Sequence, residues 1–110
     1  MKYKVKKLDR RFRYNYLYEY AVDFHRRMIG NDIHVIWYNQ ALQWCHRTWG
    51  WSAEVSQIEI IRKYVSSQNS TDFPPECNAN WSWSNQCDAL RIYLASDKEL
   101  AMFFLVNANR

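Results

Sequence analysis

Basic and aromatic residues alternate near the N-terminus, and this spacing suits the binding of single-stranded nucleic acid. Five rings occupy every second position, namely Phe12, Tyr14, Tyr16, Tyr18 and Tyr20. On an extended strand, side chains two residues apart share a face, so these rings would line one face and the arginines between them the other. Bases stack on aromatic rings, while phosphates pair with Lys and Arg. The candidate nucleic-acid-binding residues are therefore Lys4, Lys6, Lys7, Arg11, Arg13, Tyr14 and Tyr16.

A protein partner is the alternative that we favour from the sequence. Tyr, Trp and Arg are enriched at the energetic centres of protein interfaces, and the chain has six Trp and eight Tyr residues. Trp81 and Trp83 follow a Pro-containing loop, and we expect at least one of the two indoles to lie near the surface. The candidate protein-binding residues are Trp81, Trp83, Tyr18 and Tyr20. Self-association and a structural role in a virion belong to the same class of function.

The charge distribution bears on the choice between these two functions. Residues 1–13 hold seven basic side chains and one acidic side chain, whereas the rest of the chain holds eight basic and ten acidic ones. Residues 1–10 are therefore predicted to be a basic arm on a single domain that covers residues 1–110. An extended polyanion would be repelled by the net negative remainder, so the charges favour a protein partner. The glycine-spaced aromatic motif of the common RNA-recognition fold is also missing from residues 90–95.

Cysteine and histidine are too widely spaced to indicate a metal site or a catalytic centre. Cys77 and Cys87 are ten residues apart, and Cys45 is adjacent to His46, whereas structural zinc ligands usually come in pairs two to four residues apart. Neither His25 nor His34 completes a recognisable nucleophile and base pattern. We expect no metal, no cofactor and no catalytic residue, and hence a protein that is not an enzyme.

The composition indicates a packed protein without a membrane span. The chain has 110 residues, of which 48% are hydrophobic and 24% are charged. Its longest apolar run, residues 100–106, is much shorter than the roughly 20 residues of a membrane-spanning helix. The basic N-terminus lacks the apolar stretch of a secretory leader, and an odd number of cysteines fits a reducing compartment. These features predict a cytoplasmic protein.

Apolar spacing predicts one principal helix, over residues 33–49. Leu42, Cys45 and Trp49 recur at intervals of three and four residues, and Asn31 or Asp32 would cap the first turn. Gly50 stands where a helix commonly ends in a left-handed residue. This helix would position the aromatic strand by packing on one face of a sheet.

The remaining elements are shorter. Residues 52–67 suit a helix or a strand, and the β-branched residues at their centre favour the strand. A polar loop is predicted over residues 66–80, followed by strands at Trp81 and over residues 90–95. The Ser96 to Glu99 segment is a capping box, which predicts a short helix at that point. The order strand, helix, strand, strand, helix, strand predicts an α+β fold with one small sheet, of the ferredoxin-like pattern.

Residues 91–106 read RIYLASDKELAMFFLV, a strand followed by an acidic turn and a short aromatic helix. This segment resembles the end of small uncharacterised proteins encoded by bacteriophages. The resemblance implies a phage accessory or host-directed protein that acts in the host cytoplasm. It brings no catalytic residue with it.

Overall fold

The computed structural model describes residues 3–26, 33–86 and 89–107. Its elements, in chain order, are β1 (Lys4–Lys7), β2 (Tyr20–Arg26), α1 (Ile33–Trp49), α2 (Val55–Ser67), β3 (Trp81–Ser84), β4 (Ala89–Leu94) and α3 (Asp97–Asn107). The predicted α+β class is confirmed, because the four strands form one antiparallel sheet in the order β1-β2-β4-β3. The order of elements along the chain differs from that of the ferredoxin-like pattern, since two strands precede the first helix and two helices follow one another.

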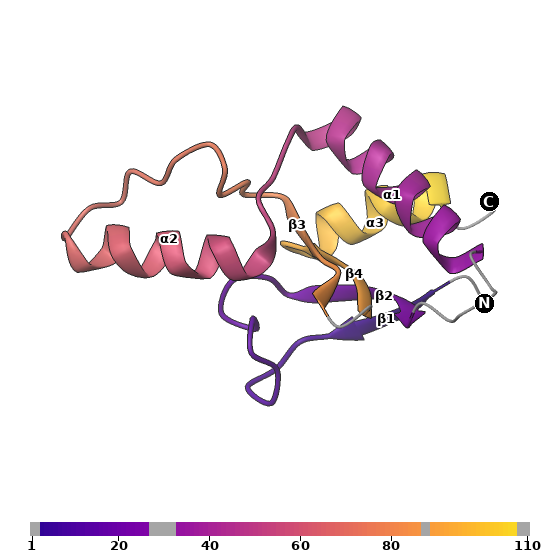
Figure 1. Cartoon of the computed structure of the whole chain (residues 1–110), viewed down its shortest axis with the longest axis horizontal. Coiled ribbons are helices and arrows are strands. Elements are labelled where there is room, and N and C mark those ends of the chain that lie inside the picture. The colour runs from indigo at the N-terminus through magenta and orange to yellow at the C-terminus, as the bar shows by residue number, and fades with distance from the viewer. Residues whose placement is uncertain (1–2, 27–32, 87–88, 108–110) are drawn as a thin grey trace.

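The sheet has one face covered by α1 and α3 (Figure 1). Val22 of β2 lies opposite Ile92 of β4, and both are fully buried beneath the two helices. Trp44 of α1 meets Phe103 of α3 edge to face, with ring centroids 5.8 Å apart. The main hydrophobic core therefore lies between these two helices and one side of the sheet.

Helix α1 begins and ends at the residues that the sequence predicts. Gly50 ends it with a φ of +88°, a conformation that glycine adopts without the strain of a Cβ atom. The buried face of the helix differs slightly from the one predicted, which was to contain Leu42, Cys45 and Trp49. Cys45 is fully buried as expected, whereas Leu42 and Trp49 are half-buried at the edge of the core.

The preference for a strand over residues 52–67 is wrong, because residues 55–67 form α2. The side chain of Glu54 accepts a hydrogen bond from the backbone N–H of Ser56 and so caps the first turn. Ile58 is fully buried on one side of the helix, while the β-branched Ile60 points to solvent. Figure 1 shows α2 extending away from the sheet, with the irregular segment over residues 68–80 returning alongside it. The polar loop is thus confirmed.

The aromatic ladder is not a continuous strand. Hydrogen bonds from the Phe12 N–H to the Asp9 carbonyl and from the Leu17 N–H to the Tyr14 carbonyl fold residues 9–17 into turns. The strand begins only at Tyr20. The five rings consequently do not share one face. The segment at residues 8–19 instead crosses the side of the sheet that α1 and α3 leave uncovered.

The predictions for the basic arm and for the C-terminal helix have different outcomes. Part of the predicted basic arm, Lys4–Lys7, is the edge strand β1 and pairs with β2. The predicted start of a helix after Ser96 is confirmed, because α3 begins at Asp97, and there the Ser96 hydroxyl donates a hydrogen bond to the Glu99 carboxylate. The helix then continues to Asn107. No helix within the described ranges is long and apolar enough to cross a membrane.

Candidate functional site

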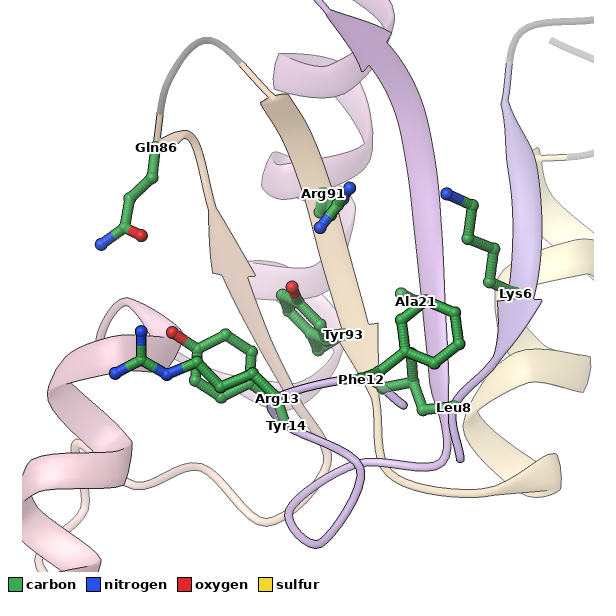
Figure 2. A pocket seen from close by; sticks show the side chains of 9 residues that line it. All are labelled: Lys6, Leu8, Phe12, Arg13, Tyr14, Ala21, Gln86, Arg91 and Tyr93. Carbon is green, nitrogen blue, oxygen red and sulfur yellow. The ribbon is translucent and has the colours of Figure 1, made fainter. Parts of the chain in front are cut away.

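A pocket of about 210 Å³ lies on the face of the sheet opposite α1 and α3. Its lining combines three cationic side chains with three aromatic rings (Figure 2). The cations are Lys6, Arg13 and Arg91, and the rings are Phe12, Tyr14 and Tyr93. Figure 2 shows Lys6 on one side of the pocket and Arg13 on the other, with Tyr93 between them.

Strand register brings the floor of the pocket together. Lys6 of β1 is opposite Ala21 of β2, and Ala21 is in turn opposite Tyr93 of β4. Cross-strand neighbours point to the same face, so these three side chains form one row. The methyl group of Ala21 is the smallest of the three, which leaves a hollow between the lysine stem and the tyrosine ring.

The turns over residues 9–17 build the wall above this floor. Tyr14 packs against Tyr93 edge to face, with ring centroids 5.5 Å apart and an interplanar angle of 78°. The guanidinium of Arg13 lies 5.4 Å from the centroid of the Tyr14 ring, within cation–π range. The wall therefore presents rings and a cation to the pocket at the same point.

Two cations of the pocket share one carboxylate. The Lys6 ammonium lies 3.4 Å from Asp23 Oδ2, and Arg91 Nε lies 3.6 Å from the same oxygen. Arg91 Nε is buried yet has no hydrogen-bond partner at normal distance. One positive charge at this end of the pocket is therefore left without a carboxylate of its own.

Glu59 of α2 holds the third cation. Arg13 Nη2 donates to Glu59 Oε1 at 3.0 Å, the Tyr16 hydroxyl donates to Glu59 Oε2 at 2.6 Å, and Lys63 lies 3.8 Å away. The hydrogen bond from Tyr16 and the pairing with Arg13 keep the pKa of the Glu59 carboxyl below its ordinary value, against the opposing effect of its burial. Burial of the hydroxyl, together with this hydrogen bond, raises the pKa of Tyr16 to about 12. Tyr16 is consequently a neutral donor at neutral pH.

Of the four residues predicted to bind a protein, two are buried and two are partly exposed. Trp81 is fully buried, and Tyr18 is buried with its hydroxyl donating to the Asn78 carbonyl at 3.3 Å. Trp83 is half-buried, and the Tyr20 hydroxyl bonds the Asp97 carboxylate. Residues two apart on a strand share a face, so both indoles lie on the same side of β3, and the half-buried Trp83 is the one that lies nearer the surface. Both indoles point to the α1 side of the sheet, where they contact the main core.

The predicted nucleic-acid-binding residues divide into two groups. Lys6, Arg13 and Tyr14 line the pocket, and Tyr16 lies beside it at Glu59. The other three, Lys4, Lys7 and Arg11, are exposed and do not line the pocket. Arg11 forms a 2.9 Å ion pair with Asp9.

Sequence reasoning missed Arg91 and Tyr93, although a signal for them was present. In the segment Leu90-Arg91-Ile92-Tyr93-Leu94 the aliphatic residues alternate with the two polar ones. If the aliphatic residues face the core, the arginine and the tyrosine must face the other side of the sheet. That second face is where the pocket lies.

The cysteines and histidines do not gather within the described ranges. No group of three or more His, Cys, Asp or Glu side chains there is placed to hold a metal ion. Cys45 and Cys77 are separate buried thiols, and Cys87 lies outside the described residues, as do Asn31 and Asp32. Burial raises the pKa of the Cys45 thiol, which disfavours the thiolate that nucleophilic catalysis requires.

Comparison of the chain with protein-family models, with curated proteins and with solved structures finds no match in any of the three. The functional interpretation therefore depends on the chemistry of the pocket and of the surfaces around it.

Proposed function

We propose that the protein is a non-enzymatic binding module that holds single-stranded nucleic acid on the open face of its sheet. The observation that carries this proposal is the convergence of three rings and three cations, from β1, β4 and the turns over residues 9–17, on one pocket. Rings offer stacking surfaces to any base, and cations pair with the phosphates that join the bases. Neither group alone would distinguish a nucleotide from an apolar or an anionic ligand.

The size of the pocket supports a ligand group no larger than one nucleotide unit. Pockets that enclose drug-sized molecules usually measure roughly 300 to 1,000 Å³. A volume of about 210 Å³ is below that range. One base or one phosphate would fill it, so a longer ligand has to continue outside.

The lining residues have distinct expected roles. A base would stack against Phe12, the half-buried ring of the wall, because Tyr14 and Tyr93 are themselves buried against each other. Lys6 and Arg91 would pair with a phosphate at the end of the pocket near Asp23. Binding would therefore strengthen as ionic strength falls.

Titration of fluorescent single-stranded DNA and RNA at several salt concentrations, including about 150 mM, tests the proposal. We expect Phe12→Ala to weaken binding at every salt concentration, because a lost stacking contact is insensitive to salt. Arg91→Gln should weaken binding and reduce the salt dependence by roughly one phosphate contact. Lys7→Gln is the control, since Lys7 is an exposed cation of the basic N-terminal region that does not line the pocket.

Two results would oppose the nucleic-acid function. One is that the folded wild-type protein does not bind single-stranded DNA or RNA with micromolar or tighter affinity at physiological salt. The other is equal weakening by Lys7→Gln and Arg91→Gln, which would indicate diffuse attraction to the positive charge of the protein and no role for the pocket.

A protein partner remains the second candidate because α2 carries an apolar outer surface. Ile60 and Tyr64 lie one turn apart, and each is 67% exposed. Such a surface differs from the one predicted at Trp81, Trp83, Tyr18 and Tyr20. A phage-encoded protein would present it to a host or viral macromolecule in the cytoplasm, to a second copy of itself, or to a virion component. Capture from a host lysate with and without nuclease separates this candidate from the first, because only a protein-mediated interaction survives nuclease treatment.

A further inference from the structure

A second aromatic and basic surface lies beside the pocket, where the turns over residues 9–17 meet α2. Tyr16 is 57% exposed, although its hydroxyl is held by the buried carboxylate of Glu59. The side chains of Arg13 and Lys63, which pair with the same carboxylate, are 69% and 70% exposed. Two cations share one carboxylate here, so one positive charge is not neutralised.

Arg13 belongs both to the pocket and to this second surface. It lines the pocket, and its guanidinium bonds Glu59 Oε1, while Tyr16 bonds the other oxygen of that carboxylate. The surface formed by Arg13, Tyr16 and Lys63 is thus continuous with the pocket. A ligand that leaves the pocket past Arg13 would meet the ring of Tyr16 next.

We propose that Tyr16, flanked by Arg13 and Lys63, is a second nucleotide subsite, so that the ligand is an oligonucleotide that runs from the pocket towards α2. This inference rests on the proposed nucleic-acid function and names its ligand class more narrowly. The Tyr16 ring stacks with a second base, and Arg13 and Lys63 pair with the phosphate that joins this base to the one in the pocket. The hydrogen bond to Glu59 fixes the ring before binding, which lowers the entropy lost when the ligand docks.

A purely structural reading of the same contacts is that Glu59 only fastens the turns over residues 9–17 to α2. The two readings differ in what the ring does. A fastening role depends on the hydroxyl of Tyr16, whereas a subsite depends on its aromatic face. Tyr16→Phe keeps the face and loses the hydrogen bond, and Tyr16→Ala loses both.

The experiment measures affinities of the full chain for a mononucleotide, a dinucleotide, a tetranucleotide and a hexanucleotide of one sequence. We expect the wild-type affinity to rise from the mononucleotide to the tetranucleotide. Tyr16→Ala should weaken tetranucleotide binding by between about fivefold and about 150-fold, the range of one lost base stack, and leave mononucleotide binding unchanged. Tyr16→Phe should weaken tetranucleotide binding much less than Tyr16→Ala does, because it keeps the stacking face and loses only the hydrogen bond that fixes the ring. Tyr64→Ala is the matched control, because Tyr64 is also an exposed tyrosine, whereas the residues that bond or pair with Glu59 are Arg13, Tyr16 and Lys63.

Lys63→Gln provides an independent variant in case Tyr16→Ala does not fold. Removing one phosphate contact should lower the salt slope for the tetranucleotide by about 0.7, the value for one contact to a single strand, and leave the mononucleotide slope unchanged. An affinity that does not depend on ligand length would overturn the second subsite while leaving the pocket function standing. So would equal weakening by Tyr16→Phe and Tyr16→Ala. Failure of all four ligands to bind would overturn the proposed function itself.

Discussion

The indole N–H of Trp81 donates a hydrogen bond of 2.9 Å to the backbone carbonyl of Gly50, which precedes it by 31 residues. Trp83 makes the equivalent bond of 3.0 Å to the carbonyl of Ser52. The two indoles of β3 thereby hold the link between α1 and α2 against the edge of the sheet. A buried indole needs an acceptor for its N–H, and here the link supplies one for each ring.

This relationship predicts that Trp81→Phe destabilises the protein by about 1 to 3 kcal/mol, because the hydrogen bond to Gly50 is lost and a smaller ring underfills the buried site of Trp81. Urea denaturation followed by circular dichroism measures the change. Trp51→Phe is the control, since the same substitution is made in the same link at a side chain that is 58% exposed. Equal stability of the two variants would show that the Trp81 bond contributes nothing.

Helix α3 offers a test of the core through two adjacent phenylalanines. Phe103 is fully buried against Trp44 and Tyr3, whereas Phe104 is 39% exposed at the edge of the same cluster. We expect Phe103→Ala to cost about 3 to 5 kcal/mol of unfolding free energy, through lost burial and the cavity left behind. Phe104→Ala should cost about 1 kcal/mol or less. The order of the two thermal midpoints is the measurement, and a reversed order would place the wrong face of α3 against the sheet.

Glu59 should make the protein less stable in acid. Its pKa in the folded protein is lowered, chiefly by the hydrogen bond from Tyr16 and the pairing with Arg13, although burial acts in the opposite direction. A carboxyl of this kind stabilises the fold above its unfolded pKa of about 4.3, and the contribution is lost as the pH falls through the lower, folded value. Glu59→Gln should therefore cost about 1 to 3 kcal/mol near pH 7 and much less near pH 3.

The control for this pH dependence is Glu76→Gln, because Glu76 is exposed. We expect that variant to follow the wild-type stability at both pH values in urea titrations. If Glu59→Gln loses the same unfolding free energy at both pH values, the charge of Glu59 does not stabilise the fold through Arg13 and Tyr16.

Cys45 should be inert in the native protein. It is fully buried in α1, and burial raises the pKa of its thiol, so that very little thiolate exists at neutral pH. In a Cys77→Ala, Cys87→Ala background, an aromatic disulfide reagent should modify Cys45 far more slowly in buffer than in concentrated urea. Equal rates in the two solutions would contradict the burial of this side chain.

Local patterns in the sequence were sufficient for α1, α3 and the α+β class. The period of apolar residues and Gly50 predicted both ends of α1, and the Ser96 and Glu99 pair predicted the start of α3. Each of these signals acts between residues at most four apart, so it does not depend on the rest of the fold. Part of the pocket was also foreseen, since Lys6, Arg13 and Tyr14 were predicted to act together.

Only the tertiary structure decided the course of residues 9–19, the helical state of α2 and the burial of the two β3 indoles. Arg13 and Glu59 are 46 residues apart, and Tyr18 and Asn78 are 60 apart. The alternating aromatic residues, taken alone, have the period of a strand. The contacts with distant residues favour turns, because turns bury the rings of Tyr14 and Tyr18 and leave Tyr16 exposed. The free energy of strand propensity is smaller than the free energy gained by burying several rings. The long-range contacts therefore determine the structure of this segment.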